Sequence, residues 1–253
     1  MRFKITLEKI NKDILPIDYQ YALASWIYST IHSGNSEFAD WLHENGYQTE
    51  KRKYKLFCFS RLFFKFNPMG DRIQIISREA EFQISFVAEK AVEPFIMGLF
   101  QNQSMALGDS KSRVDFQIKS VEKLPEADFS SGRAQFTVRS PICISHLIPN
   151  KNTATYLSPE DENYSEYLKS NLVHKYNSLF PEAVLDDIPF SFKLLNRADS
   201  KLITIKRGEP EETKVRGYLY SFELSANKEL LAFGYDCGFG EKNSMGFGFV
   251  DKK

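Results

Sequence analysis

Residues 238–250 read GFGEKNSMGFGFV, the most distinctive stretch in this chain of 253 residues. Five of the 13 glycines fall within the 17 positions 234–250. Glycines at this density permit positive φ angles and let another backbone approach closely, and N–H groups after a helix can hold a phosphate. The stretch therefore predicts either an anion-binding loop or a tight helix-to-strand connection that binds nothing.

Two common nucleotide-binding motifs do not fit this loop. The Gly-x-Gly-x-x-Gly motif of dinucleotide-binding proteins fails because Asn243 stands where the third glycine is needed. The sequence also lacks the Gly-x-x-x-x-Gly-Lys-Ser/Thr motif of P-loop proteins. Both classes of nucleotide site are therefore excluded.

The first half of the chain shows a regular order of strand and helix patterns. Residues 2–9 alternate apolar and polar side chains, the period of a half-buried strand. A helix follows Pro16, because apolar residues from Tyr19 to Ile31 recur at spacings of three and four. Ser36 is the predicted cap of a second, short helix. The remaining elements predicted here are that helix at 37–44, a hairpin of 56–66 and 72–77 around a turn at 67–71, strand character at 82–87, a helix at 89–100 and a strand at 114–121.

The second half repeats this order and ends in the glycine-rich loop. It predicts strands at 134–138, 190–195, 202–206, 215–224 and 247–250, with helices at 160–179 and 227–235. The order β-α-β-β-α-β is that of the ferredoxin-like unit. A polar stretch at 125–133 marks a boundary. We therefore predict an α+β fold of two tandem ferredoxin-like domains, residues 1–124 and 134–253.

Composition indicates a globular protein of a reducing compartment. Hydrophobic residues make up 42% and charged residues 26% of the chain, which excludes wholesale disorder. The three cysteines are far apart in sequence and form neither a disulfide framework nor a zinc motif. No window approaches the roughly 20 apolar residues of a membrane span. The sequence thus predicts a cytoplasmic protein without a membrane segment or a structural metal.

The formal net charge of zero hides two regions of opposite sign. Residues 50–66 carry six basic side chains against one acidic side chain, whereas residues 158–187 carry seven acidic against two basic. Either region can be a solvated face, but the basic one is also a candidate surface for a polyanion.

The glycine-rich loop also carries a resemblance to a known family. Two Gly-Phe-Gly triplets, 238–240 and 246–248, are separated by five residues and followed by apolar Phe249 and Val250. This pattern resembles the C-terminal loop of the CRISPR-associated RAMP proteins, and the chain looks most like their stand-alone endoribonucleases, which cut precursor CRISPR RNA within its repeats. The resemblance implies two tandem ferredoxin-like domains and CRISPR repeat RNA as the partner. It implies no cofactor or metal, and it leaves open other CRISPR effector subunits as partners and a monomer or a homodimer.

The same resemblance points to three catalytic residues near the N-terminus. In that family the cleaving residues, typically a Tyr, a His and a Lys, lie on and just after the first helix and at the start of the second strand. The matching positions are Tyr28, His43 and Lys55. Other candidates remain, and they are Tyr19, Tyr21 and Tyr47 for the tyrosine and His32, His146 and His174 for the histidine.

These residue types suit cleavage of RNA by its own 2′-hydroxyl. A neutral imidazole can take the proton of the attacking 2′-OH, or an imidazolium can protonate the leaving 5′-oxygen. A Lys ammonium stabilises the charge on the phosphorane, and a Tyr hydroxyl orients the same group. The products would be a 2′,3′-cyclic phosphate and a 5′-hydroxyl. The alternative is a non-catalytic RAMP subunit that binds guide RNA.

Residues predicted to contact RNA fall into three groups, namely the basic run after the second helix, the two ends of the hairpin around residue 209, and the glycine-rich loop. They are Lys51, Arg52 and Lys53; Lys206, Arg207, Lys214 and Arg216; and Gly238, Gly240, Lys242, Asn243, Gly246 and Gly248.

Overall fold

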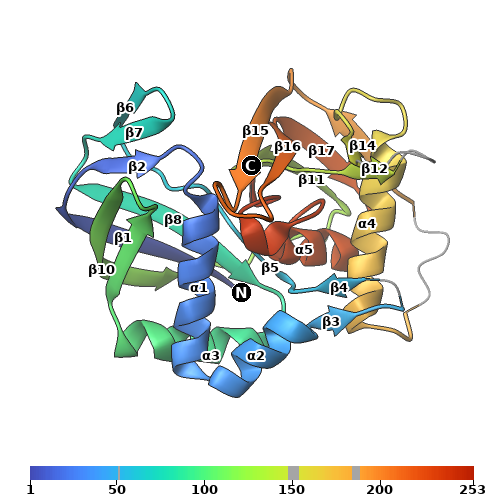
Figure 1. The fold of residues 1–253 in the computed structure, drawn as a ribbon. Coiled ribbons are helices and arrows are strands. Elements are labelled where there is room, and N and C mark those ends of the chain that lie inside the picture. Colours follow the sequence, from blue (N-terminus) through green and yellow to red (C-terminus); the bar gives the residue numbers. More distant parts are fainter. Residues whose placement is uncertain (51, 148–153, 184–188) are drawn as a thin grey trace.

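The computed structural model describes residues 1–50, 52–147, 154–183 and 189–253. The chain forms two lobes that lie side by side, each with its own sheet and its own helices (Figure 1). Within the described residues, none of the helices has the length and apolar character needed to cross a bilayer.

The first lobe is built on a five-stranded antiparallel sheet in the order β5-β8-β1-β10-β9. Its strands are β1 (Arg2–Asn11), β5 (Phe57–Phe59), β8 (Glu79–Phe86), β9 (Ser104–Gly108) and β10 (Arg113–Lys123). The helices α1 (Gln20–Gly34) and α3 (Glu89–Gln101) pack closely against each other beside this sheet. Taken along the chain, β1-α1-β5-β8-α3-β10 is the ferredoxin-like order, with β9 added at the edge.

The second lobe repeats this arrangement with four strands in the order β14-β17-β11-β18. They are β11 (Arg133–Val138), β14 (Ser191–Leu194), β17 (Ser221–Ser225) and β18 (Val250–Lys252), and its helices are α4 (Tyr164–Leu179) and α5 (Lys228–Cys237). The residues between β10 and β11 form neither helix nor strand. The predicted tandem ferredoxin-like fold is confirmed, whereas the exact domain limits stay a prediction.

Smaller elements decorate both lobes. They are a sheet of β2 (Ile14–Pro16), β7 (Arg72–Ile75) and β6 (Phe66–Met69), the pairs β3 (Tyr47–Gln48) with β4 (Lys53–Tyr54), β12 (Ser145–Leu147) with β13 (Ala154–Tyr156) and β15 (Asp199–Ile205) with β16 (Thr213–Leu219), the helix α2 (Ser36–Glu44) and the 3₁₀ turn η1 (Asn243–Met245).

Two of the predicted strands are each divided in the structure. The predicted strand 56–66 splits, because Phe57–Phe59 joins β8 in the main sheet and only Phe66–Met69 forms the hairpin with β7. The predicted strand 215–224 also splits, since it changes sheets at Tyr220 between β16 and β17. Alternation is a local signal and does not say which strand lies alongside, so one continuous pattern can serve two sheets.

The cap of α2 differs from the prediction by one residue. The side chain of Asn35, not of Ser36, accepts a hydrogen bond from the N–H of Phe38 at 2.9 Å. Asn35 has extended backbone angles and so stands just outside the helix, as a capping residue must.

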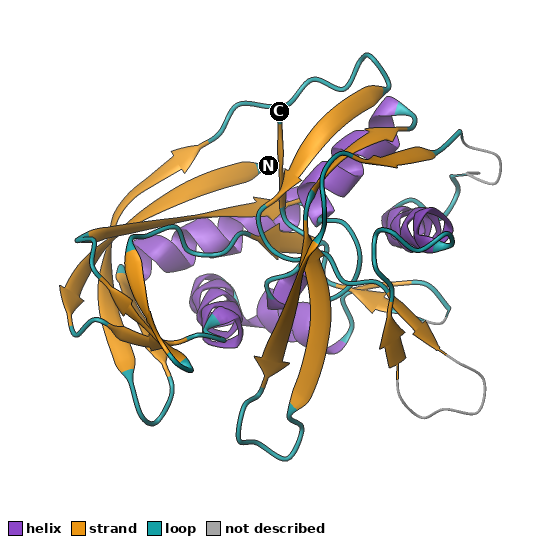
Figure 2. Cartoon of the chain, turned by 90° about the horizontal axis from the view of Figure 1, so that it is seen from above, coloured by secondary structure: helices purple, strands orange, loops and turns teal. Residues whose placement is uncertain are grey.

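The start of β1 contacts the last helix and the last strand between the lobes, and the N and C labels lie near each other when the molecule is seen from above (Figure 2). Arg2 of β1 is buried, and its guanidinium lies over the ring of Tyr235 at 3.2 Å from the centroid and over that of Phe249 at 4.3 Å. It donates to the carbonyls of Tyr235 and Val250. The first strand of the molecule is therefore tied to its last helix and last strand.

Candidate active site between the two lobes

The three predicted catalytic residues come together on one side of the first lobe. Tyr28 lies on α1, His43 on the last turn of α2, and Lys55 between β4 and β5. The rings of Tyr28 and His43 are 6.1 Å apart between centroids and stand edge to face. All three side chains line one pocket of about 590 Å³, which we call the active pocket.

Lysines hold the end of the helix that carries His43. Lys55 Nζ donates to the carbonyl of His43 at 2.5 Å and to that of Leu42, and Lys53 Nζ donates to the carbonyl of Glu44 at 2.7 Å. The last carbonyls of a helix have no partner in the helix itself and form the negative end of its dipole, so they attract cations. These contacts hold the last turn of α2 in place, and the side chain of His43 is exposed on that turn.

The environment changes the acidity of two of the three residues. Burial lowers the pKa of Lys55, and the neighbouring charge of Lys53 lowers it further. Burial raises the pKa of Tyr28 to about 12, although a hydrogen bond with Ser244 opposes that shift. The Tyr28 hydroxyl therefore keeps its proton near neutral pH and can donate it in a hydrogen bond, but it does not act there as a base.

The glycine-rich loop of the second lobe completes the active pocket. Ser244 and Met245 of the loop line it, together with Lys206 at the end of β15. Ser244 and Tyr28 line the pocket together, and the turn η1 that carries Ser244 packs against α1. The pocket is therefore built by both lobes, and neither lobe forms it alone.

The glycines of the loop are required by its backbone conformation and close packing. Gly238, Gly240, Gly246 and Gly248 all have positive φ angles between 72° and 89°. A Cβ at Gly248 would lie 2.0 Å from the carbonyl oxygen of Phe239, and one at Gly240 would lie 2.5 Å from that of Cys143. Only a residue without a side chain fits such places.

Most of the loop's glycine N–H groups are used inside the protein. Those of Gly238, Gly246 and Gly248 donate to the carbonyls of Gly234, Asn243 and Pro141. They are not available to a phosphate, contrary to the expectation of a backbone cradle at these three positions. The exposed tip of the loop is Lys242, which itself has a φ of 57°.

A second pocket of about 350 Å³ adjoins the active pocket and shares Lys55 and Ser244 with it. We call it the basic groove, because five of the side chains that line it are basic and one is acidic. The basic ones are Arg52, Lys53, Lys55, Lys175 and Lys242, and the acidic one is Glu241. The groove thus gathers the predicted contacts Arg52, Lys53 and Lys242, whereas Lys51 lies outside the described residues.

Matches to known proteins now identify the family. The family model described as "CRISPR-associated protein Cas6, N-terminal" matches residues 14–122, and the one described as "CRISPR associated protein Cas6, C-terminal" matches residues 122–252. This chain belongs to the Cas6 family. The resemblance seen in the sequence is thereby confirmed.

Whole-chain relatives agree with these matches. The CRISPR-associated endoribonuclease Cas6 1 of Methanocaldococcus jannaschii is 31% identical over 262 residues, which cover 99% of this chain and 92% of that protein. A solved structure described as CRISPR associated protein Cas6 has a TM-score of 0.78 at 30% identity and covers 100% of this chain and 99% of that one. The structure of a Cas6-related protein of Pyrococcus furiosus has the same fold, with a TM-score of 0.84 at 23% identity over 100% of this chain and 98% of that one.

The predicted contacts on the β15–β16 hairpin of this Cas6 chain divide into three kinds. Lys206 lines the active pocket. Arg207 forms an ion pair with Asp18, just before α1, and so helps to join the lobes. Lys214 and Arg216 lie on the exposed face of β16, and neither is among the residues that line the two pockets above.

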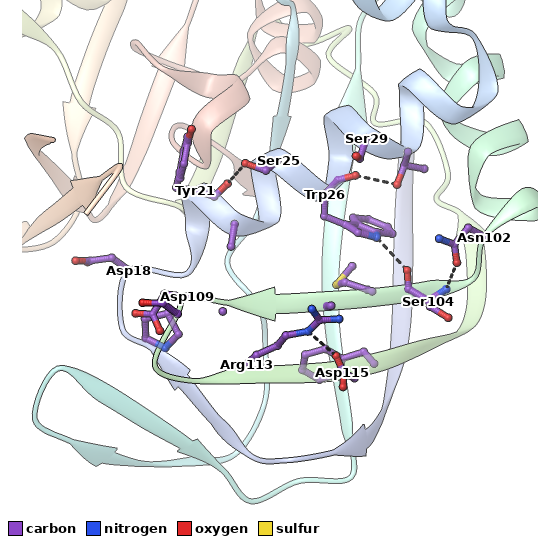
Figure 3. Close-up of a pocket in the computed structure, with 18 of the residues that line it drawn as sticks. Asp18, Tyr21, Ser25, Trp26, Ser29, Asn102, Ser104, Asp109, Arg113 and Asp115 are labelled. Carbon is purple, nitrogen blue, oxygen red and sulfur yellow. Dashed lines mark hydrogen bonds and ion pairs between the residues drawn. The ribbon is translucent and has the colours of Figure 1, made fainter. Parts of the chain in front are cut away.

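A third and larger hollow, of about 990 Å³, continues from the active pocket along α1 (Figure 3). Tyr21, Ser25, Ser29 and Lys206 line both. Its far wall is the edge strand β9, to which Trp26 is tied by a hydrogen bond from Nε1 to the carbonyl of Ser104 at 3.2 Å. Many of the side chains that line this hollow carry hydroxyl or amide groups. No sequence motif marks such residues, so the hollow could not be predicted from the sequence.

Two acidic residues that line this hollow have cationic partners beside it. Asp115 pairs with Arg113 at 2.9 Å, and Asp109 pairs with Arg72 at 2.8 Å. The hydrogen bond from Arg72 lowers the pKa of Asp109 to about 2. These carboxylates therefore add little net negative charge beside the active pocket.

The structure distinguishes Tyr28 from the three alternative candidates for the catalytic tyrosine. Tyr19 is buried and its hydroxyl accepts a hydrogen bond from the N–H of Leu62 at 2.9 Å, while Tyr47 packs edge-on against Trp41 at 5.2 Å between ring centroids. Tyr21 lines the active pocket, but Tyr28 is the tyrosine that contacts His43.

Of the three alternative candidates for the catalytic histidine, two lie away from the active pocket and one lines it. His146 is bound to the hydroxyl of Tyr167 at 2.5 Å, and His174 lies near Ser170 on the exposed side of α4. His32 lies one turn after Tyr28 on α1 and lines the active pocket with His43. Two imidazoles therefore share the pocket. Among the described residues, no three His, Cys, Asp or Glu side chains are grouped so that they could hold a metal ion.

Two residues that build the site could not be recognised from the sequence. Ser244 and Lys175 are polar residues in a loop and in an acidic helix, and only the fold shows that Ser244 reaches Tyr28 and that Lys175 reaches the loop. Such contacts join residues far apart in the chain, so no local pattern reports them.

Proposed function

We propose that this Cas6 protein is a metal-independent endoribonuclease that cuts precursor CRISPR RNA within its repeats. The 2′-hydroxyl next to the scissile bond attacks the phosphorus, the bond to the 5′-oxygen breaks, and the products are a 2′,3′-cyclic phosphate and a 5′-hydroxyl. The observation that carries the proposal is the meeting of Tyr28, His43 and Lys55 in one pocket that the glycine-rich loop closes.

Each of the three residues has a role that suits its surroundings. His43, whose ring is exposed, exchanges a proton with the 2′-hydroxyl or the leaving 5′-oxygen. Two of the three N–H donors of Lys55 go to carbonyls of α2, and the third stabilises the charge on the phosphorane oxygens. Tyr28 keeps its proton and donates a hydrogen bond that orients the phosphate.

The proposed partner is CRISPR repeat RNA, and its phosphates follow the basic groove away from the active pocket. Arg52, Lys53 and Lys242 neutralise them there, and Lys206 does so beside the scissile bond. Lys51 belongs to the same proposal by its place in the sequence.

The other predicted RNA contacts act less directly in this proposal. Lys214 and Arg216 meet a more distant part of the repeat from the exposed face of β16. Arg207, the loop glycines and Asn243 act through the shape of the site. We keep residues 1–124 and 134–253 as the proposed domains.

Cleavage of a repeat RNA in excess EDTA tests this function. Wild-type protein is expected to produce one cut with a 5′-hydroxyl that a polynucleotide kinase can label and a 2′,3′-cyclic phosphate that acid opens. His43→Ala is expected to lose about 10²- to 10⁴-fold in single-turnover rate, the range of a general acid or base.

The matched control is His32→Ala, which removes the other imidazole of the same pocket. We expect it to retain most of the rate. Equal losses in the two variants would contradict the assignment to His43, and a metal requirement would contradict the mechanism. Tight binding of the repeat without strand scission would establish the alternative, a non-catalytic RAMP subunit.

A further inference from the structure

Lys175 of α4 is a buried cation whose donors all serve the glycine-rich loop. Its side chain is 2% exposed. Its Nζ donates to the carbonyls of Gly238 and Gly240, the latter at 3.0 Å, and to Oδ1 of Asn243 at 3.1 Å. An ammonium group has three N–H donors, so the loop satisfies all of them and no donor remains for a carboxylate.

Packing alone does not explain why a lysine occupies this buried position. An ammonium group is expensive to remove from water, and an apolar side chain of similar length would fill the same space without that cost. Unlike an apolar side chain, the ammonium group forms three directional hydrogen bonds, and these hold three separate points of the loop around one nitrogen atom. Lys175 therefore limits where the loop can lie.

Asn243 carries this restraint across the loop. While its Oδ1 accepts from Lys175, its Nδ2 donates to the carbonyls of Phe239 at 3.1 Å and Phe247 at 3.2 Å. The side chain thus links both Gly-Phe-Gly triplets to the buried cation, and all the donors of its amide are used. Asn243 therefore has a role inside the loop, and its predicted contact with RNA stays a prediction.

The next residue after Asn243 reaches the catalytic tyrosine. Ser244 lies in the 3₁₀ turn η1, which packs against α1, and it lines the active pocket together with Tyr28, whose hydroxyl it approaches. A connected series of contacts thus runs from Lys175 through Asn243 and Ser244 to Tyr28, from the core of the second lobe to the active pocket of the first.

We propose that Lys175 is a positioning residue for RNA cleavage: it fixes the glycine-rich loop so that Ser244 holds the Tyr28 hydroxyl against the scissile phosphate. This rests on the proposed nuclease function for its effect on rate, but the position of Tyr28 can be measured without any cleavage.

Single-turnover cleavage in a double-mutant cycle tests the effect on rate. Lys175→Met is expected to slow cleavage by about 10- to 100-fold, the loss that follows a misplacement near 1 Å. The affinity for a repeat with a 2′-deoxy nucleotide at the cut site is expected to change less than the rate. In the Tyr28→Phe background Lys175→Met should slow cleavage less than about 2-fold, because the group that it positions is already gone. Equal slowing in both backgrounds would overturn the proposal.

Fluorine NMR of protein labelled with 3-fluorotyrosine tests the position of Tyr28 directly. Its resonance is assigned as the one lost in Tyr28→Phe. We expect Lys175→Met and Ser244→Ala to shift this resonance, and Lys228→Met, which changes an exposed lysine of α5, to leave it in place. An unshifted Tyr28 resonance in a folded Lys175→Met protein would refute the positioning role even if wild-type protein cuts RNA.

Ser244→Ala keeps the proposal testable if Lys175→Met does not fold. It leaves the buried cation in place and removes only the last link to Tyr28, so it should reproduce the loss of rate and the shift. If wild-type protein makes no cut, the proposed nuclease function fails, whereas the NMR result still decides whether Lys175 positions Tyr28.

Discussion

At the scale of single residues, Lys55 does two things with one ammonium group. It binds the carbonyls of Leu42 and His43 at the end of α2, and it lines the active pocket. Lys53, two residues earlier, binds only the carbonyl of Glu44 in this helix end. Both lysines therefore cap the end of α2, but only Lys55 lines the active pocket.

Replacing each lysine by alanine separates these tasks. We expect Lys55→Ala to reduce the single-turnover rate by about 10²- to 10³-fold, the usual effect of losing one group that stabilises transition-state charge. Lys53→Ala should reduce it less than about 10-fold and mainly weaken RNA binding at higher salt. Equal effects on rate would show that capping alone matters.

The pH dependence of cleavage reports on the same lysine. Burial, and then the charge of Lys53, lowers the pKa of Lys55, and the charged form is the one that stabilises the transition state. The rate is therefore expected to fall as pH rises through a value below that of an ordinary lysine. Lys53→Ala should move this fall to higher pH, because it removes a repelling charge.

Tyr28→Phe provides the control for this profile. Since the pKa of Tyr28 is raised to about 12, its hydroxyl stays protonated over the working range. The variant should lower the rate at every pH without moving the alkaline fall. A displaced fall would mean that Tyr28, and not Lys55, titrates.

At the scale of elements, the glycine-rich loop depends on space as well as on backbone angle. Gly248 has a φ of 79°, and a Cβ there would meet the carbonyl of Phe239 at 2.0 Å. Gly208, in the tip of the β15–β16 hairpin, has the same φ of 79° with nothing within 4 Å of such a Cβ. The two positions therefore differ in crowding and not in φ.

Alanine at these two glycines should give different losses of stability. Gly208→Ala is expected to lower the free energy of unfolding by about 1 to 2 kcal/mol, the strain of a left-handed residue. Gly248→Ala should lower it by clearly more and also slow cleavage, because Phe239 must move. Thermal melting with RNA cleavage measures both, and similar losses would show that the loop yields to the added methyl group.

At the scale of the whole molecule, the active pocket exists only while the lobes keep their mutual position. Arg2 ties β1 to Tyr235, Phe249 and Val250, and Ser85 donates to Asp236 at 2.9 Å across the same interface. Arg207 and Asp18 join the lobes on the side of the pocket. These contacts hold the lobes together both near the start of β1 and beside the pocket.

Arg2→Ala is expected to loosen this coupling. It leaves two carbonyls without their donor and two rings without their cation, so the free energy of unfolding should fall by about 3 kcal/mol. Both tryptophans, Trp26 and Trp41, lie in the first lobe, so their fluorescence follows that lobe while circular dichroism follows both.

Denaturant unfolding followed by both signals measures the effect. We expect coincident transitions in the wild type and separate ones in Arg2→Ala. Arg78→Ala, which removes an exposed ion pair with Glu8 inside the first lobe, serves as the control and should change little. Coincident transitions in Arg2→Ala would show that other contacts couple the lobes.

Local sequence patterns were enough to predict the order of elements and the position of the glycine-rich loop. Alternation in 2–9 and three-and-four spacing from Tyr19 to Ile31 are local signals, and they predict β1 and α1 closely. The two Gly-Phe-Gly triplets pointed to the family, and through it to Tyr28, His43 and Lys55 as predicted catalytic residues. Each of these inferences needs only residues near one another in the chain.

Which of these segments contact one another became clear only from the folded structure. It assigned 57–59 and 66–69 to different sheets, brought His32 into the same pocket as His43, and placed Lys175 against a loop more than 60 residues away. The physical reason is that sheet partners, buried cations and pocket walls depend on contacts between distant segments. Those contacts are selected by the packing of the whole chain, and no local period encodes them.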